Sequence, residues 1–333
     1  MKISILDQSP IGYQQSHAEA LRHTVTLSQE AERLGYSRFW VSEHHNEAFF
    51  AGSSPEILAT YLAAKTSTIR IGTGGVMLPH YSPYKIAESF RILESLEPGR
   101  IDLGIGRAPG GKPAVSRAIH YGSSTGGVDR YAEKVDDLRH FLYDSIPKNH
   151  WLSGISAVPK AGTAPEIWHL ATSKSGAGFA AEKGLPLVFA HFITPKKGLE
   201  AVTYYRDHFK PSFHQQKPKI MVAVFAMAAE TEEEAEKQAR IHDLALLYIA
   251  NGKAIEGIPT YEMTDQHQPV GLEDQIIRKN RERMIVGTPD KVKDSLLELH
   301  QTYNTDELML VSLTTDIQQK LKSIQLIAKE MSL

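Results

Sequence analysis

The sequence predicts an α/β protein, namely a (β/α)8 TIM barrel with insertions. Eight short apolar runs alternate with amphipathic helical patterns along the 333 residues. Strands joined by crossover helices lie parallel, and eight of them can close into a barrel. No flexible linker divides the chain, so we expect one domain over residues 1–333. A doubly wound open sheet is the alternative, but DQSPIGY after the first run lacks the G-x-G-x-x-G phosphate turn expected there.

The expected strands are short and β-rich, and polar or turn residues end each of them. They lie near residues 3–6, 38–42, 69–73, 101–105, 166–171, 185–191, 221–227 and 308–311. Two stretches, 144–164 and 251–272, break the alternation and are rich in turn and polar residues, so we interpret them as insertions. We expect residues 111–125, where Ser123 to Gly127 looks flexible, to shape a substrate pocket together with 251–272.

Capping signals mark the helices expected between these strands. Ser16-x-x-Glu19 and Thr231-x-x-Glu234 are capping boxes, in which a hydroxyl and a carboxylate satisfy free backbone N–H groups. Gly35 suits the C-terminal end of the first helix. Four further helix starts pair a capping hydroxyl with a proline in the first turn: Ser54-Pro55, Ser82-Pro83, Thr194-Pro195 and Thr288-Pro289.

The composition excludes several classes of function. The chain has no cysteine, which rules out disulfides, thiolate metal sites, iron–sulfur ligation and a cysteine nucleophile. A net charge of −2 gives no field that would hold nucleic acid or an anionic membrane. The first residues lack the long apolar core of a signal peptide. We therefore expect a cytoplasmic protein with neither nucleic acid nor membrane as a partner.

The first candidate for chemistry is Glu43-His44-His45, at the end of the second expected strand. Barrel enzymes carry their active sites at the C-terminal ends of the strands. Histidine can gain or lose a proton near neutral pH, so acid–base or ligand-contacting work is possible here. Neighbours on a strand point to opposite sides, and we assign the role to His44 rather than His45. The alternative is a polar strand end with solvated histidines.

A glycine-rich strand end is the second candidate. Gly72-Thr73-Gly74-Gly75 places three glycines at the end of the third expected strand. A glycine run in a strand marks a bulge or a backbone that something approaches closely. A flat ring lying against the chain would need this lack of side chains, although a plain turn into Met77 is the simpler explanation.

An anion site is the third candidate. Arg107 ends the fourth expected strand, and its planar fork of donors suits a phosphate. Thr172-Ser173-Lys174-Ser175-Gly176 opens a helix, whose N-terminal N–H groups and dipole also favour an anion. A surface ion pair for Arg107 and ordinary capping for the helix remain the alternatives. Taken together with the glycine strand, these residues predict a flat, phosphorylated cofactor.

Two histidines suggest an alternative interpretation, a metal site. His169 and His191, on the fifth and sixth expected strands, could bind a catalytic metal ion. Such a site would also need an H-x-H pair after the first strand and an aspartate at the last one, and LDQSP and LMLVSL provide neither. We therefore expect no metal. A serine hydrolase is unsupported, because no G-x-S-x-G elbow is present.

Five segments together resemble the bacterial luciferase-like monooxygenases. They are SEHH at 42–45, RIGTGGVMLPHYSP at 70–83, ESLEPGRIDLGIGRAPG at 94–110, TSKSGAGFAAEKGLP at 172–186 and VGTP at 286–289. The opening LDQSP and the continuous match indicate the branch of stand-alone luciferase-like flavin oxidoreductases. The resemblance covers essentially the whole chain and is specific only when the segments are taken together.

The resemblance implies a dimeric (β/α)8 barrel that uses reduced flavin mononucleotide (FMN) delivered by a separate flavin reductase. With dioxygen, such enzymes oxidise a small organic substrate such as an aldehyde, ketone or sulfonate. It implies His44 as the histidine beside the flavin that assists the oxygen chemistry. The implied cofactor-binding residues are Gly74, Gly75, Val76, Gly106, Arg107, Thr172, Ser173, Ser175, Gly176 and His191.

Within that set the resemblance distinguishes several roles. Gly74-Gly75 matches the site of a non-prolyl cis peptide under the flavin, and Arg107 and Ser173 match phosphate ligands. His191 falls near an aromatic position that lines the ring, and Gly106 replaces a reactive cysteine of luciferase. Both are departures from luciferase, and the one at Gly106 argues against light emission, but not against flavin binding.

The expected function is therefore an FMN-dependent monooxygenase. An apolar barrel mouth would keep water away from the reaction, and His44 would supply or accept a proton. Two alternatives use the same barrel: an oxidoreductase that depends on the deazaflavin F420, and a non-catalytic flavin-binding protein. The sequence does not identify the substrate.

Overall fold

The computed structural model describes residues 1–121, 129–252 and 256–333, and within them nine parallel strands form one sheet. The proposed flexibility of Ser123 to Gly127 falls outside these residues. The strands are β1 (Lys2–Asp7), β2 (Arg38–Val41), β3 (Arg70–Met77), β4 (Ile101–Gly106), β5 (Glu166–Ala171), β6 (Leu187–Ala190), β7 (Ile220–Ala228), β8 (Met284–Gly287) and β9 (Glu307–Val311). Pairing of β6 with β7 and of β9 with β1 closes eight of them into a barrel, which confirms the predicted fold class.

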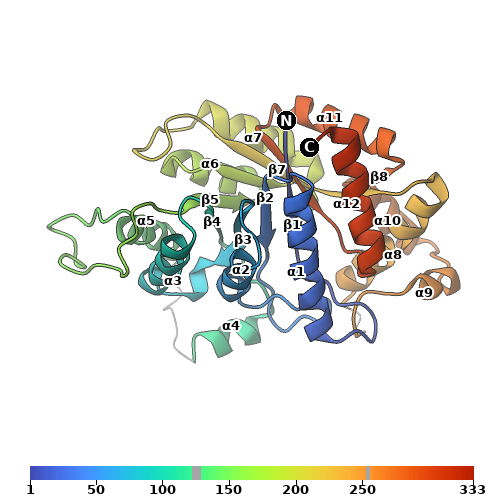
Figure 1. Cartoon of the computed structure of the whole chain (residues 1–333), viewed down its shortest axis with the longest axis horizontal. Coiled ribbons are helices and arrows are strands. Elements are labelled where there is room, and N and C mark those ends of the chain that lie inside the picture. The colour runs from blue at the N-terminus through green and yellow to red at the C-terminus, as the bar shows by residue number, and fades with distance from the viewer. Residues whose placement is uncertain (122–128, 253–255) are drawn as a thin grey trace.

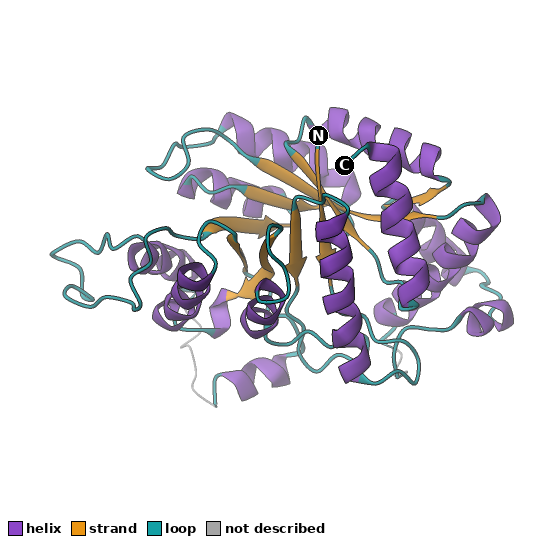
Figure 2. Cartoon of the chain, viewed as in Figure 1, coloured by secondary structure: helices purple, strands orange, loops and turns teal. Residues whose placement is uncertain are grey.

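Helices surround this barrel on its outside, as Figures 1 and 2 show. They are α1 (His17–Arg33), α2 (Pro55–Ala63), α3 (Pro83–Leu96), α4 (Pro113–Ile119), α5 (Tyr131–Leu142), α6 (Lys174–Lys183), α7 (Gly198–Asp207), α8 (Glu232–Ala250), α9 (Tyr261–Gln266), α10 (Leu272–Arg281), α11 (Pro289–Tyr303) and α12 (Ile317–Met331). Among the described residues, no helix is long and apolar enough to span a bilayer.

The ninth strand, β8, was not expected from the sequence. It pairs only with the C-terminal part of β7, from Phe225 to Ala228, while β9 pairs with the preceding part, from Met221 to Phe225. Strand β7 therefore continues past the barrel wall and binds a short extra strand there. Three of the four residues of β8 are only half-buried, and its apolar run, from Met284 to Val286, is just three residues long.

The capping predictions are partly confirmed. The hydroxyls of Ser16 and Thr231 each accept a hydrogen bond from the backbone N–H three residues later, at 3.2 Å. Gly35 adopts φ +87° just after α1, as a C-terminal glycine should. At the four hydroxyl–proline pairs the prolines begin helical turns, but none of the hydroxyls makes a cap bond, so that part of the prediction is wrong. Thr288, for example, instead contacts the carboxylate of Glu232 at 3.2 Å.

The two stretches expected as insertions behave differently from each other. Residues 143–165 contain no helix or strand and extend away from the barrel at the left of Figure 1. The region 251–272 contains the short helix α9 and the start of α10.

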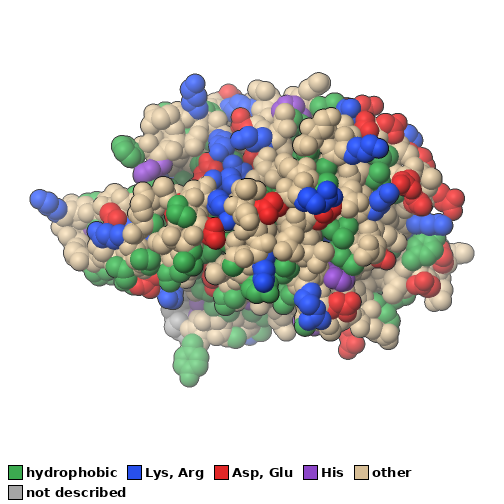
Figure 3. All heavy atoms as spheres, in the orientation of Figure 1, with side chains coloured by type: hydrophobic (Ala, Val, Ile, Leu, Met, Phe, Trp, Pro, Cys, Tyr) green, Lys and Arg blue, Asp and Glu red, His purple; other side chains and the backbone are tan. Residues whose placement is uncertain are grey.

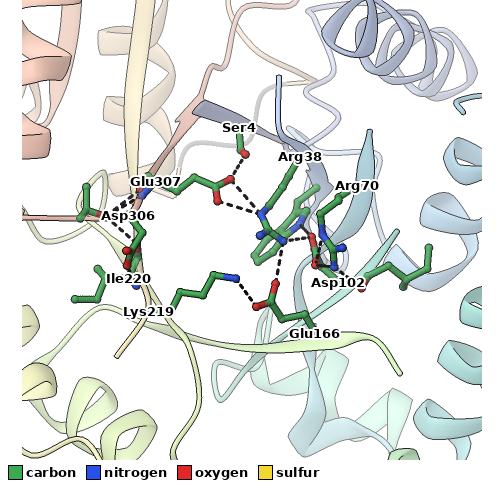
Figure 4. A network of polar contacts seen from close by, with 12 residues as sticks. Ser4, Arg38, Arg70, Asp102, Glu166, Lys219, Ile220, Asp306 and Glu307 are labelled. Carbon is green, nitrogen blue, oxygen red and sulfur yellow. Dashed lines mark hydrogen bonds and ion pairs between the residues drawn. The ribbon is translucent and has the colours of Figure 1, made fainter. Parts of the chain in front are cut away.

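A network of charged side chains fills the N-terminal end of the barrel (Figure 4). Arg38 is 4% exposed and lies between Asp102 at 2.7 Å, Glu166 at 3.2 Å and Glu307 at 3.1 Å. Arg70 pairs with the second oxygen of Asp102. Buried charges need such complete pairing, because removing one partner leaves the other uncompensated. The network fills this end of the barrel with paired side chains.

Candidate active site

A cavity of about 850 Å³ opens at the C-terminal end of the barrel, above the charged network. Its inner part is apolar and lined by Leu6, Trp40, Val188, Ala223 and Met309. Its outer part is polar and exposed, and it includes Arg107 and the first residues of α6. Apolar residues are not confined to the floor, because Ile193, which is half exposed, also lines the cavity, and the expected apolar mouth stays a prediction. Ligand sites in proteins commonly have this size and this mixture of surfaces.

His44 lies on the wall of this cavity. Its Nδ1 contacts the hydroxyl of Ser42 at 3.1 Å, its Nε2 faces the side-chain amide nitrogen of Gln8 at 3.5 Å, and its ring stacks on Phe50 at 4.4 Å. Burial, aided by the neighbouring His45, lowers the pKa of His44 to about 4. The imidazole is therefore neutral near pH 7 and has a lone pair with which to accept a proton.

Glu43 also lines the cavity, although no role was predicted for it. This carboxylate is fully buried and accepts hydrogen bonds from the backbone N–H of Met77 at 2.8 Å, the Tyr81 hydroxyl at 2.7 Å and Nε2 of His45 at 2.7 Å. His45 bonds Glu43 and does not itself line the cavity, although Glu43, on the same side by strand alternation, does. These bonds tie the end of β2 to the end of β3 and fix the segment that carries His44.

The glycines of β3 make room for different neighbouring groups. A Cβ on Gly72 would lie 2.6 Å from the Trp40 indole nitrogen, and one on Gly75 would lie 2.7 Å from the Gly104 carbonyl. Of these glycines only Gly74 lines the cavity, beside Leu6. The Gly74–Gly75 peptide is cis, as the resemblance implied, and the pairing with β4 shifts register there.

Gly106, at the end of β4, faces the cavity directly. A Cβ at this position would meet only the sulfur of Met77, at 3.5 Å. Any larger side chain would therefore project into the cavity rather than into the protein. The lack of a side chain at Gly106 keeps that space open for a ligand.

Arg107 and the N-terminus of α6 face the outer part of the same cavity. Thr172, Ser173, Ser175 and Gly176 all line it, so the structure gathers the predicted anion-binding residues. Ser173 caps the helix, because its hydroxyl accepts from the N–H of Gly176 at 3.3 Å. Arg107 pairs with Asp129 across the surface, and its side chain is 64% exposed. The structure therefore contains the helix cap and the surface ion pair, and it also brings these residues together at one cavity.

Three of the residues implied by the resemblance lie outside the cavity lining. Gly75 packs on β4, Val76 is fully buried in the hydrophobic core, and His191 bonds the Tyr303 hydroxyl through Nδ1 at 2.9 Å. Burial lowers the pKa of His191 to about 4. Conversely, Gln8 and Tyr131 line the cavity without having been singled out. Gln8 could have been found as the residue just past the first strand end.

His169 is buried in the cavity wall, and its Nδ1 contacts the Tyr131 hydroxyl at 3.2 Å. Burial, with the nearby charge of Arg107, lowers the pKa of His169 to about 4. His169 and His191 thus bond to different tyrosines. Within the described parts of the chain, no three histidine or carboxylate side chains gather in a metal-binding arrangement.

The loops expected to shape the substrate pocket lie elsewhere in the part of the chain that is described. None of the described residues of 111–125 or 251–272 lines the cavity. Residues 258–262 instead border a second, polar hollow of about 1,130 Å³, together with residues that follow β1 and β9. The first cavity is instead bounded by the strand ends, by α6 and by single residues such as Tyr131 of α5 and Tyr204 of α7.

Comparisons with known proteins agree with this fold. The family model described as luciferase-like monooxygenase matches residues 1–306. The Bacillus subtilis protein YwcH is 46% identical over 98% of both chains. The N-acetyl-S-alkylcysteine monooxygenase of the same organism is 36% identical over 98% of this chain and 97% of its own.

Solved structures extend the comparison. The structure of apo-MsnO8 has a TM-score of 0.89 and 35% identity, and covers 100% of this chain and 98% of that one. The oxygenating constituent of 3,6-diketocamphane monooxygenase from Pseudomonas putida, solved with FMN, has a TM-score of 0.73 at 18% identity, covering 99% and 97%. An F420-dependent secondary alcohol dehydrogenase has a TM-score of 0.65 at 14% identity, covering 99% and 98%. The last two show a shared fold and no more.

Proposed function

The chain belongs to the luciferase-like monooxygenase family, and from this premise we propose that it is an FMN-dependent monooxygenase acting on a small organic substrate. The observation that carries the proposal is one cavity with an apolar floor, a glycine wall and an anion-binding rim. Its two ends differ in polarity as the ring and the phosphate of FMN do. The solved relative that contains FMN gives a precedent on the same fold.

The residues present fit this cofactor. Gly106 leaves open the space that a Cβ would begin to fill, which suits a flat ring against the wall. At the rim, Arg107 and the free N–H groups at the start of α6 offer charge-assisted and dipolar binding to a phosphate. Asp129, which pairs with Arg107, would have to release it when the phosphate binds.

Reduced flavin, when bound, supplies the electrons and the site at which dioxygen reacts. The protein's part is to bind, orient and shield. Arg107 and Ser173 would hold the phosphate, and Gly74 and Gly106 would let the ring lie close to the wall. Leu6, Trp40 and Met309 exclude water at the floor, and neutral His44 accepts a proton through Nε2.

Partners follow from the same premise. The diketocamphane enzyme is named as the oxygenating constituent of its system, which supports a separate flavin reductase as a transient partner here. The N-acetyl-S-alkylcysteine monooxygenase makes thioethers the first substrates to try. We also propose a homodimer in the cytoplasm.

An exposed apolar surface supports the dimer. Ile57 and Tyr61 on α2, and Ile92 and Leu96 on α3, are each about half or more exposed. Hydrophobic side chains gather over this part of the molecule in Figure 3. Monomers rarely leave a contiguous apolar patch of this kind uncovered.

Oxygen uptake tests the proposed function. The protein, a flavin reductase, NADH and FMN are mixed with a panel of thioethers, aldehydes and ketones. We expect substrate-dependent oxygenated product, and its loss in His44→Gln. Product formed anaerobically with F420 would favour the deazaflavin alternative, and FMN binding without turnover of any substrate would favour the non-catalytic one.

A further inference from the structure

The turn that follows β1 is held unusually firmly. The carboxylate of Asp7 is buried and accepts from Lys320 Nζ at 2.5 Å, from the Thr24 hydroxyl at 2.6 Å and from the N–H of Ser9 at 3.2 Å. Ser9 itself adopts φ +50°, a left-handed conformation that non-glycine residues seldom take. Such conformations persist where the surroundings impose them, and they cluster at functional sites.

This turn places the side chain of Gln8 in the cavity. Gln8 is only 8% exposed and lines the cavity beside His44. The one polar contact that the structure gives its side chain joins Gln8 Nε2 to His44 Nε2, at 3.5 Å. A primary amide nitrogen can only donate a hydrogen bond, so in this orientation of the Gln8 amide His44 Nε2 is the acceptor.

The other side of the imidazole agrees with this assignment. If Nε2 carries the lone pair, the ring proton of neutral His44 lies on Nδ1, where the Ser42 hydroxyl oxygen can accept it at 3.1 Å. Phe50 stacks on the ring with an interplanar angle of 29° and limits its rotation. The ring is therefore held from two edges and one face.

We propose that Gln8 is a positioning residue that holds His44 in the Nδ1–H tautomer, so that the Nε2 lone pair is directed to the cavity as the proton acceptor. The role in catalysis rests on the proposed function, because it assumes that His44 moves a proton there. Imidazole Nε2 has one lone pair, so a ligand's donor would take the place of the Gln8 amide there. The turn at Asp7 contributes indirectly, because its hydrogen bonds fix the position of Gln8.

Histidine ¹⁵N NMR of the flavin-free protein tests the proposal. Two-bond ¹H–¹⁵N correlations at pH 7 show which ring nitrogen carries the proton, and His44→Gln identifies the His44 signal by its loss. We expect a bare Nε2 in the wild type. Gln8→Glu, whose carboxylate only accepts when ionised, should place a proton on Nε2, and Gln8→Met should give a mixture of tautomers.

The chain offers a matched control in a second glutamine–histidine pair. Gln15 Nε2 lies 3.2 Å from His23 Nδ1, away from the cavity. Gln15→Glu should alter the His23 signal and leave that of His44 unchanged. A wild-type His44 protonated on Nε2, or a His44 tautomer unaffected by both Gln8 variants, would overturn the proposal. Because no flavin is present, a failure to bind or turn over flavin counts separately against the proposed function.

Discussion

At the residue scale, the site depends on a few positions where a side chain is absent or held. Gly106 is the clearest case, because it borders the cavity and a Cβ there would meet only Met77. Gly104, two residues earlier on the same strand, is the opposite case, because a Cβ there would lie 2.0 Å from the Thr73 carbonyl oxygen. One glycine makes room for a ligand and the other for the protein.

We predict that Gly106→Val weakens FMN binding by at least roughly tenfold, equivalent to about 1.4 kcal/mol, because its methyl groups enter the ring's space. Stability should change little. Isothermal titration and urea unfolding measure the two effects. Gly104→Ala, the control, should lower the free energy of unfolding or prevent folding. Unchanged FMN affinity in Gly106→Val would show that the ring does not lie against this wall.

The sequence could reveal His44, Gly74 and Arg107, because each directly follows or lies within an apolar strand. It could not reveal that Asp129 pairs with Arg107, because the two belong to different segments that only the fold brings together. The same applies to Arg38, whose partners Asp102, Glu166 and Glu307 come from three other strands. Closure of the barrel decides those contacts.

At the element scale, the N-terminus of α6 is both a capped helix start and part of the cavity lining. Ser173 caps the helix through Gly176 and also borders the cavity. Thr231 caps α8 in the same way, through Glu234, but lies outside the cavity. Ser173 and Thr231 therefore form a matched pair of caps, of which only Ser173 should contribute to cofactor binding.

We predict that Ser173→Ala and Thr231→Ala each lower the free energy of unfolding by about 1 kcal/mol, the usual value of such a cap. Only Ser173→Ala should also weaken FMN binding, by several-fold, because it removes a phosphate contact. Urea denaturation and FMN titration of both variants measure this. Equal FMN affinity in the two variants would reduce Ser173 to a structural cap.

Elements were predictable to the extent that local signals define them. Seven of the eight barrel strands begin and end within two residues of the expected bounds, because each is a short apolar run between turn signals, whereas β3 continues four residues further, to Met77. Strand β8 was missed because its apolar run, from Met284 to Val286, is only three residues long, and because it pairs with the C-terminal part of β7, which only the fold brings to it. The hydroxyl–proline caps failed because proline alone is sufficient to start those helices.

At the scale of the whole molecule, stability should depend on pH through four histidines. Burial lowers the pKa of His44, His169 and His191 to about 4 and that of His242 to about 3. The unfolded chain binds protons below about pH 6.5, whereas the folded protein does not until pH 4 or 3. This contribution to stability is therefore complete above pH 6.5 and is lost as the pH falls.

We predict that the free energy of unfolding falls between pH 6.5 and pH 4, by up to about 1.4 kcal/mol per pH unit for each such histidine. Urea unfolding at several pH values measures this slope. His242→Gln, at a site outside the cavity lining, should have a shallower slope than the wild type. An identical slope would show that His242 is not kept neutral in the fold.

The dimer prediction also belongs to the whole molecule. Leu96→Glu, on the apolar surface of α2 and α3, should convert the dimer to a monomer, because it buries a charge in an apolar interface. Leu272→Glu is the control, since Leu272 is 70% exposed on α10. Light scattering after size-exclusion chromatography measures the mass. A wild-type monomer, or a dimer that survives Leu96→Glu, would rule this surface out.

The central claim is that the cavity binds reduced FMN with its phosphate at Arg107 and the start of α6. Anaerobic titration of the wild type and Arg107→Ala with reduced FMN and reduced riboflavin tests it most directly, with Arg130→Ala as a control for loss of a surface arginine. The wild type should prefer FMN by roughly tenfold or more, since a charged hydrogen bond contributes about 1.5–3 kcal/mol. Arg107→Ala should lose that preference and Arg130→Ala should keep it. Equal affinity of the wild type for both flavins, or a preference retained in Arg107→Ala, would contradict the account.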